Sequence, residues 1–426
     1  MSGVNGRLLI GCVADDFTGA SDAASFLVAE GINTMLFNGA PKAAGMVENC
    51  AAVVIALKTR NIEPREAVRE TREAFRWLNG QGAKQFYLKY CSTFDSTQDG
   101  NIGPNIDSTL EDYQQRYTVI CPALPVNRRV VKAGILYVDG VPLAESHMKN
   151  HPLNPMWASD IAKLMEPQGK YACLKINQEL LAKPQAVIEQ YVASFAQTHD
   201  RFYVVPDYVT EEDAEKIVTV FGNLKLLTGG SGLLAPLGRK HRREGSLPAC
   251  RPIASGSKGR GIILAGSCSK ATLGQIEDFI GQGGKAYKIE PARFMRGEAT
   301  VDTIWRFVED NPLDEVLVYS SDSEANVKEN QKLGQVKVSA VLEGLVAELA
   351  RRAVANGFTR IVVAGGETSG AVILGLALDG FIIGESIAPG VPVMIPAGRR
   401  ELRLVLKSGN FGQRDFFSRA LAMTRG

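Results

Sequence analysis

The chain has 426 residues, of which 45% are hydrophobic and 22% are charged, values that are ordinary for a soluble globular protein. Its length predicts two or three domains. The 48 Lys and Arg residues nearly balance 46 Asp and Glu residues, and a net charge of +2 argues against a nucleic-acid or membrane-surface protein. No apolar run approaches the ~18 residues of a membrane span, and R-L-L-I-G-C-V-A is too short for a signal core. We therefore expect a cytoplasmic enzyme or binding protein.

Neither the cysteines nor the histidines form a metal-binding motif. The seven cysteines are scattered without a C-x-x-C pair, which indicates reduced and mostly structural thiols. His147 and His151 are four residues apart, but Pro152 follows directly and the segment reads as a loop without a third ligand. We predict no metal site built from protein side chains alone.

Short apolar runs in the first half of the chain alternate with longer amphipathic segments. They predict strands at residues 8–14, 52–57, 85–90, 118–123, 202–207 and 225–230, and helices at 63–79, 178–198 and 210–221. Continuous hydrophobicity within the strands indicates that both faces of the sheet are covered, as in a parallel sheet flanked by helices. The pattern predicts an α/β domain.

A second series with the same pattern begins after residue 260. It predicts strands at 261–267, 316–321, 360–366 and 402–409, with helices at 270–282, 337–356, 367–378 and 413–424. Between the two series lies a segment rich in Pro, Gly, Ser and basic residues, which is typical of a linker. We predict a domain at 1–237, a linker at 238–258 and a domain at 259–426. Two mainly parallel α/β domains favour an active site in the cleft between them.

The basic residues of the predicted linker admit two interpretations. The cluster consists of Arg239, Lys240, Arg242 and Arg243. It could attract phosphate groups, but a solvated linker is the favoured interpretation.

Three segments of the second domain join an apolar strand to small residues and a helix start. They are L-A-G-S-C-S-K-A-T, V-V-A-G-G-E-T-S-G-A-V and V-L-K-S-G-N-F-G. Ligands of open α/β sheets bind beyond the carboxyl ends of strands, where helix N-termini offer free N–H groups to anions. Each segment alone is more often a tight turn, but three in one domain favour a phosphate-binding site. Neither a P-loop nor a strand-linked G-x-G-x-x-G motif is present.

The side chains of these three segments suggest their roles. Gly365, Gly366 and Gly370 allow phosphate to approach the backbone, and hydroxyls come from Ser267, Thr368, Ser369 and Ser408. Glu367 would suit a contact to Mg²⁺-bound water or ribose. Lys407 ends a strand, where it could meet a transferring phosphoryl group or extend to water.

Polar residues also gather at strand ends in the first domain. Asp15 and Asp16 follow the first strand, Lys58 and Arg60 the second, and Lys89 ends the third. The following loop, K-Y-C-S-T-F-D-S-T-Q-D-G-N-I-G-P, carries Ser92, Thr93 and Asp95 among its hydroxyls and carboxylates. These groups match a polyol, and the cations match an anionic group. The alternative is a capping and turn segment, and Asp16 alone could cap the helix that follows it.

These motifs resemble those of the four-carbon acid sugar kinases, over essentially the whole chain. The similarity lies in V-A-D-D-F-T-G-A-S-D, G-S-C-S, A-G-G-E-T-S-G-A-V and L-K-S-G-N-F-G. The loop after residue 89, together with H-P-L-N-P-M, resembles the 3-oxo-tetronate kinase branch. The chain departs from that branch at Asn154 and Trp157, where threonine is more usual.

The resemblance implies a substrate domain followed by an ATP domain, and Mg²⁺-dependent phosphorylation of the C4 hydroxyl of a four-carbon sugar acid. It implies a catabolic pathway with dehydrogenase, isomerase and aldolase partners. By the same resemblance, the nucleotide-contacting positions are Ser267, Gly365, Gly366, Glu367, Thr368 and Gly409. The alternatives are a kinase of D-threonate, L-threonate or D-erythronate, or a binding protein without turnover.

A mechanism follows as a hypothesis. Phosphoryl transfer depends on alignment and charge neutralisation more than on covalent help from the protein. We expect Arg60 and Lys89 to hold the sugar acid, and Asp16 to accept the proton or orient the attacking hydroxyl. Asp15 and Asp95 are rivals for that role, and Lys407 would assist the transferring phosphoryl group. A homodimer is left open as the assembly.

Overall fold

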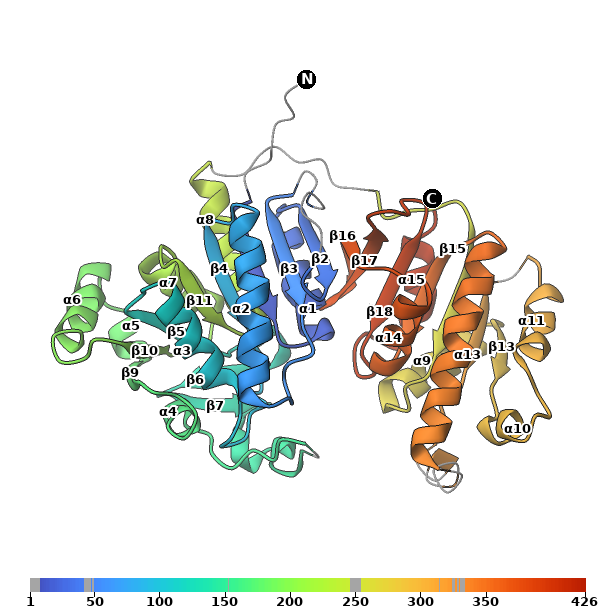
Figure 1. Cartoon of the computed structure of the whole chain (residues 1–426), viewed down its shortest axis with the longest axis horizontal. Coiled ribbons are helices and arrows are strands. Elements are labelled where there is room, and N and C mark those ends of the chain that lie inside the picture. Colours follow the sequence, from blue (N-terminus) through green and yellow to red (C-terminus); the bar gives the residue numbers. More distant parts are fainter. Residues whose placement is uncertain are drawn as a thin grey trace. The chain divides into compact units, whose positions relative to one another are not determined.

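The structure is a computed structural model of the chain (Figure 1). It describes residues 8–41, 47, 50–151, 153–245, 254–313, 315–323, 326, 327, 329 and 334–426. The chain divides into two compact units, residues 1–251 and 252–426. Each unit is an α/β structure with a mainly parallel sheet flanked by helices, which confirms the predicted fold class. None of the described helices is both long and apolar enough to cross a membrane.

The first unit contains a parallel sheet in the order β2-β3-β1-β4-β11-β5-β10-β9. The strands are β1 (Ile10–Ala14), β2 (Thr34–Asn38), β3 (Ala52–Ala56), β4 (Gln85–Lys89), β5 (Tyr117–Cys121), β9 (Ala172–Ile176), β10 (Phe202–Pro206) and β11 (Leu226–Gly229). A small antiparallel sheet contains β6 (Arg129–Lys132), β7 (Ile135–Val138) and β8 (Val141–Pro142). In the large sheet Ala14 lies level with Ala56 and Lys89, so β1, β3 and β4 end together.

Helices accompany this sheet. They are α1 (Phe17–Ala29), α2 (Pro64–Gly80), α3 (Ile102–Asp112), α4 (Ile161–Met165), α5 (Gln178–Leu181), α6 (Gln185–Phe195), α7 (Glu211–Phe221) and α8 (Leu234–Arg243). Helix α2 shows why they form: Pro64 opens it, the Glu63 carboxylate caps it, and its buried residues Ala67, Thr71, Ala74 and Leu78 recur at helical spacing. The predicted helix at 178–198 was wrong as one element, because Pro184 separates α5 from α6.

The second unit contains a mixed sheet in the order β13-β14-β12-β15-β18-β17-β16. Its strands are β12 (Arg260–Ala265), β13 (Lys285–Lys288), β14 (Val316–Tyr319), β15 (Phe358–Ala364), β16 (Gly380–Ala388), β17 (Val391–Pro396) and β18 (Arg403–Lys407). The neighbouring strands from β13 to β18 in this order, namely β13, β14, β12, β15 and β18, are parallel to one another. Strands β16 and β17 form an antiparallel hairpin, and β17 pairs with β18 in the antiparallel direction. The sequence interpretation missed β13 and this hairpin.

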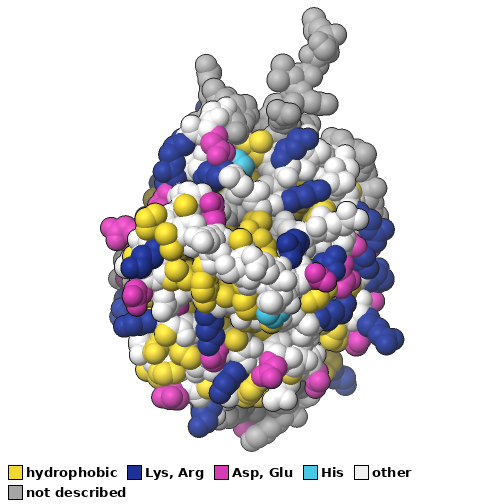
Figure 2. Space-filling view, turned by 90° about the vertical axis from the view of Figure 1, so that its left-hand side faces the viewer, with side chains coloured by type: hydrophobic (Ala, Val, Ile, Leu, Met, Phe, Trp, Pro, Cys, Tyr) yellow, Lys and Arg dark blue, Asp and Glu magenta, His cyan; other side chains and the backbone are white. Residues whose placement is uncertain are grey.

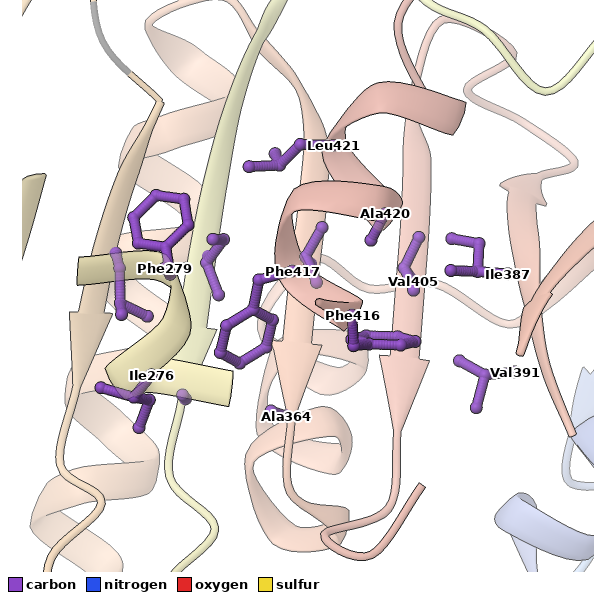
Figure 3. Packing of buried hydrophobic residues seen from close by; sticks show 14 of the residues in the cluster. Ile276, Phe279, Ala364, Ile387, Val391, Val405, Phe416, Phe417, Ala420 and Leu421 are labelled. Carbon is purple, nitrogen blue, oxygen red and sulfur yellow. The ribbon is translucent and has the colours of Figure 1, made fainter. Parts of the chain in front are cut away.

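The core of the second unit lies between the sheet and helices α9 and α15. The helices are α9 (Lys270–Gly281), α10 (Pro291–Met295), α11 (Val301–Glu309), α13 (Gln335–Ala355), α14 (Gly366–Gly375) and α15 (Phe416–Met423). Phe279 of α9 and Phe416 and Phe417 of α15 pack with Val362 and Val405 of the strands (Figure 3). Apolar burial of this extent, at about 25 cal/mol per Å², fixes α9 and α15 on the sheet.

The predicted linker at 238–258 is shorter than expected at both ends. Residues 238–243 belong to helix α8, where Arg239 pairs with Glu30 and Glu215, and Arg243 pairs with Glu215. Basic residues in the last turn suit the negative end of the helix dipole, which the composition alone did not reveal. At the other end, the Arg403 guanidinium donates to the carbonyl oxygens of Ala254 and Ser255. Residues 246–253 lie outside the described part of the chain.

Candidate functional site

The two sheets share a strand order that defines a ligand site in each unit. From β1 the chain crosses to β2 and β3 on one side and then to β4 on the other, giving the order β2-β3-β1-β4. The second unit repeats this arrangement as β13-β14-β12-β15. In open α/β sheets, ligands bind beyond the carboxyl ends of the strands where the direction of crossing reverses. The two switch points therefore lie at the ends of β1 and β4, and of β12 and β15.

The first switch point is built around Arg60. Its guanidinium makes two hydrogen bonds to Asp15, with Nε 2.8 Å from Oδ2 and Nη2 3.0 Å from Oδ1. Nη2 is also 2.8 Å from Asp16 Oδ1, and Nη1 is 3.8 Å from Asp95 Oδ2. Burial alone would raise the pKa of Asp15, but Arg60 and Lys89 lower it below its ordinary value. The guanidinium thus holds together carboxylates from two separate loops.

Asp16 performs two tasks at the start of α1. Its Oδ1 accepts a hydrogen bond from the Gly19 N–H at 2.8 Å, so Asp16 caps the helix. The same side chain contacts Arg60 and remains 30% exposed, against 12% for Asp15 and 9% for Asp95. Asp16 is therefore the most accessible of the three carboxylates.

Lys89 lies beneath these carboxylates and is only 4% exposed. Its Nζ donates to the Tyr90 carbonyl at 3.1 Å. A Cβ at position 19 would lie 2.5 Å from that Nζ, so the glycine of D-D-F-T-G makes room for the ammonium group. Burial alone would lower the pKa of Lys89, but Asp15 and Asp16 raise it above its ordinary value. The lysine is charged and offsets the acidic cluster.

The loop after β4 forms the other wall of this site. Thr93 Oγ1 donates to Asp95 Oδ1 at 2.8 Å, and both side chains are buried. Asn154 approaches from a distant segment, with Nδ2 2.7 Å from Asn61 Oδ1 and 3.4 Å from the Asp95 carbonyl. Ser92 lies beside the G-G-S-G segment that follows β11, 3.5 Å from a Cβ built at Gly230. The structure thus brings together six of the seven residues predicted for this site, namely Asp15, Asp16, Arg60, Lys89, Thr93 and Asp95, whereas Ser92 lies beside Gly230.

Several polar residues of the site escaped the sequence interpretation. A small cavity is lined by Asp15, Arg60, Thr71, Asn101 and Asn105, among others. Asn101 Nδ2 donates to the carbonyls of Thr59 and Ile62, which fixes the loop that carries Arg60. Asn105 Oδ1 is buried without a hydrogen-bond partner among the described residues. The sequence offers no distinct signal for them, because Asn101 precedes and Asn105 lies within α3, a helix that was not among those predicted.

The second switch point carries small residues in place of charges. The N–H groups of Gly266 and Ser267 donate to the Ala364 carbonyl at 2.9 and 3.1 Å, and the Gly365 N–H donates to the Lys407 carbonyl at 2.9 Å. These bonds join the three segments that the sequence singled out. A Cβ at Gly409 would lie 2.3 Å from Ser267 Oγ, so a larger residue there would displace this hydroxyl.

Helix α14 begins in this site. Gly365 is its N-cap, and Gly366 and Glu367 are exposed in the first turn, whereas Thr368 is 8% exposed. Exposed N–H groups at a helix start, surrounded by hydroxyls, are suited to phosphate. Asp322, which the sequence interpretation missed, also lies here: its N–H donates to Cys268 Sγ, and its carboxylate is 2.8 Å from Lys288 Nζ.

Lys407 is buried at the end of β18. It is 1% exposed, and its Nζ donates to Thr272 Oγ1 and to the carbonyls of Ser408 and Gly409. The prediction that it meets a phosphoryl group stays a prediction, and its contacts are taken up below.

No cluster of three or more His, Cys, Asp or Glu side chains in the described part of the chain could hold a metal ion by itself. His147 lies in a short 3₁₀ segment, and His151 Nδ1 accepts a hydrogen bond from the Asn154 N–H.

Comparisons with known proteins match this division into two sites. A family model described as "Sugar-binding N-terminal domain" matches residues 10–237, and one described as "Nucleotide-binding C-terminal domain" matches residues 262–417. A sugar-binding unit followed by a nucleotide-binding unit defines the class of two-domain sugar kinases.

Curated relatives indicate which family of kinases the chain resembles. The chain is 40% identical to a 3-oxo-tetronate kinase of Brucella melitensis, over 96% of this chain and 94% of that protein. It is 39% identical to one of Cupriavidus necator, over 99% and 98% of the two chains. Solved structures of proteins from Salmonella typhimurium LT2 and Haemophilus influenzae are 39% and 37% identical, with TM-scores of 0.89 and 0.85, and each comparison covers 97% of this chain and 99% of the other. The chain belongs to the four-carbon acid sugar kinase family.

Proposed function

We propose that the protein is an ATP-dependent kinase that transfers the γ-phosphoryl group to the C4 hydroxyl of 3-oxo-tetronate. The observation that carries the proposal is the pairing of two switch points of different chemistry. The first holds carboxylates and cations suited to a polar, anionic ligand, and the second holds glycines, hydroxyls and a helix start suited to phosphates. The choice of 3-oxo-tetronate as the substrate follows the relatives that are named 3-oxo-tetronate kinase.

The sugar acid is assigned to the first switch point. Among the described residues, the hydrogen bonds of Arg60 involve Nε and Nη2, and Nη1 lies 3.8 Å from Asp95 Oδ2, whereas Lys89 Nζ donates to the Tyr90 carbonyl. Both cations therefore retain donors for the carboxylate of the substrate. Ser92, Thr93 and Asp95 would bind its hydroxyl or oxo groups.

Asp16 is the residue we assign to the attacking hydroxyl. It is the most exposed carboxylate of the cluster, and its contacts with Gly19 and Arg60 hold it in one position. Because these contacts fix the carboxylate, Asp16 serves mainly to orient the attacking hydroxyl and to receive its proton. Asp15, which is bonded on both oxygens to Arg60, would position rather than react.

ATP is assigned to the second switch point. The N–H groups at the start of α14 would receive its phosphates, with Ser267, Thr368 and Gly409 around them. Mg²⁺ usually keeps several waters and binds one or two carboxylates together with the phosphates. The exposed Glu367 fits such a water-mediated contact, and the ion would neutralise phosphate charge there.

A substrate panel tests the proposal. ADP release is measured with 3-oxo-tetronate, D-threonate, L-threonate and D-erythronate, and phosphorus NMR locates the phosphate on the product. We expect 3-oxo-tetronate to give the highest kcat/KM and a 4-phosphate. A different preferred acid would change the substrate, and no ADP release with any acid would favour a binding protein. We further propose a cytoplasmic catabolic role.

Nucleic-acid binding is not favoured, although the Salmonella structure was provisionally described as a tRNA synthase. Dark blue and magenta side chains are interspersed on the face drawn in Figure 2. The basic cluster of α8 is largely paired with Glu30, Glu215 and Glu244. RNA binding would require a basic patch of one sign.

A further inference from the structure

Lys407 ends the buried strand β18 at the edge of the nucleotide site. Its ammonium group has three N–H donors, and three acceptors lie within hydrogen-bond distance: Thr272 Oγ1 at 2.9 Å, the Gly409 carbonyl at 2.9 Å and the Ser408 carbonyl at 3.2 Å. The side chain is 1% exposed. All of its donors are therefore used within the protein, and none is left for a phosphate.

The acceptors of Lys407 belong to two different nucleotide-binding segments. Gly409 lies after β18, whereas Thr272 lies in the first turn of α9, directly after the G-S-C-S segment. The Gly409 carbonyl also accepts from Ser269 Oγ at 2.6 Å and from Thr272 Oγ1 at 3.0 Å. Ser269 in turn caps α9 through the Thr272 N–H. Lys407 thus ties the turn after β18 to the start of α9.

The two segments also approach each other closely at this tie. Gly409 packs so closely on Ser267 that a Cβ would lie 2.3 Å from its hydroxyl oxygen. The loop after β12 is bonded in turn to the end of β15 through the Ala364 carbonyl. A shift of the 408–409 turn would therefore move the hydroxyls that surround the start of α14.

We propose that Lys407 is a positioning residue of the nucleotide site, which holds Gly409 and the first turn of α9 together, rather than a group that contacts the transferring phosphoryl. This inference rests on the proposed function for its site. The two possible roles of Lys407 predict different kinetic effects. A positioning residue acts on nucleotide affinity, whereas a group on the phosphoryl acts on the chemical step.

Lys407→Met tests the assignment, because methionine fills a similar volume without donors. Isothermal titration with magnesium ADP, which needs no sugar acid, should give a Kd raised about tenfold, since misplaced binding groups lose affinity. The KM for ATP should rise in parallel, while kcat at saturating ATP falls less than about fivefold. Lys285→Met is the matched control, because Lys285 is exposed on the edge strand β13. It should leave both constants unchanged.

Thr272→Val keeps Lys407 and removes only the hydroxyl that it contacts. It should raise the Kd for ADP about threefold, and it carries the test if Lys407→Met does not fold. An unchanged Kd in both variants, or an unchanged Kd with kcat lowered about 100-fold in Lys407→Met, would overturn the proposal. Wild-type protein that binds ADP but phosphorylates no acid would refute the kinase function and leave the ADP comparison valid.

Discussion

Lys89 and Lys407 both end a buried strand, Lys89 in the first unit and Lys407 in the second, but they differ in their surroundings. Each is the last residue of its strand and is almost inaccessible to solvent. Lys89 is surrounded by carboxylates, which raise its pKa above the ordinary value despite its burial. Lys407 contacts only neutral acceptors, and burial lowers its pKa to about 8. A buried lysine at a strand end is thus paired with carboxylates in the first unit, and in the second it is bonded to neutral groups of two loops, the arrangement that we propose positions them.

The difference extends to the whole of each switch point. The first unit concentrates three carboxylates around Arg60, and its geometry is held by ion pairs. The second unit relies on backbone hydrogen bonds and glycine contacts between neutral segments. A site that holds a sugar acid needs charges to orient it, whereas a site for phosphates can rely on N–H groups and a helix start. Perturbing one site should leave ligand binding by the other unchanged.

Asp16→Asn should have the largest effect. Asparagine still caps α1, so the melting temperature should change by little, but kcat should fall by about 10²–10⁴ because the hydroxyl loses its proton acceptor. The coupled ADP-release assay measures the change. Asp112→Asn, which alters an exposed pair with Arg72, is the control. Near-normal turnover in Asp16→Asn would remove Asp16 from the chemistry.

Arg60→Met should abolish binding of the sugar acid while leaving the Kd for ADP unchanged. Removal of the guanidinium leaves adjacent carboxylates unpaired, so the protein should also lose about 1–3 kcal/mol of stability. Titration calorimetry with each ligand and urea unfolding measure the two effects. Equal loss of ADP binding would show that the two sites are not independent.

Gly409→Ala is the corresponding change in the second unit. The added Cβ would lie 2.3 Å from Ser267 Oγ and 3.0 Å from Ser269 Oγ, so these hydroxyls must move out of the nucleotide site or the segments must separate. We expect the Kd for ADP to rise about tenfold and the affinity for the sugar acid to stay the same. Gly398→Ala, where an added Cβ meets nothing within 4 Å, should change neither.

A change of pH should affect ligand binding at the two sites differently, with a smaller effect than the substitutions above. Lys407, with a pKa of about 8, loses a proton and one donor between pH 7 and about 9.5, so ADP affinity should weaken by about threefold. Because its folded pKa lies below the unfolded value, its deprotonation also relieves a cost to folding as pH rises from 8 towards 10.5. Lys89 has a raised pKa, so its contribution to stability persists through this range and is lost only above it.

Calorimetric titrations of both ligands at pH 7 and 9.5 measure this contrast. Lys407→Met should remove the pH dependence of ADP binding. Sugar-acid binding that weakens as much as ADP binding would contradict the difference between the two lysines.

Much of each site could be predicted because its residues follow strand ends. The carboxyl ends of parallel strands lie at the same edge of a sheet. D-D-F-T-G and G-G-E-T each follow such a strand, so both were expected beyond the carboxyl edge of their sheets. The contacts among these residues could not be predicted. Arg60 lies 45 positions from Asp15, and Asn154 lies 93 positions from Asn61, distances that no local pattern spans. The β16–β17 hairpin escaped prediction because its strands differ in direction from the alternating α/β pattern.

The sequence by itself determined the two α/β units and the chemical character of their strand ends, because local hydrophobicity and residue type decide both. Only the tertiary structure decided what each charged side chain does. Asp16 both caps a helix and faces a ligand site, Arg60 binds three carboxylates, and Lys407 turns inward to carbonyl groups. The reason is physical: the partner of a buried charge is whatever group packing places within about 3 Å, and packing joins residues that are distant in the chain.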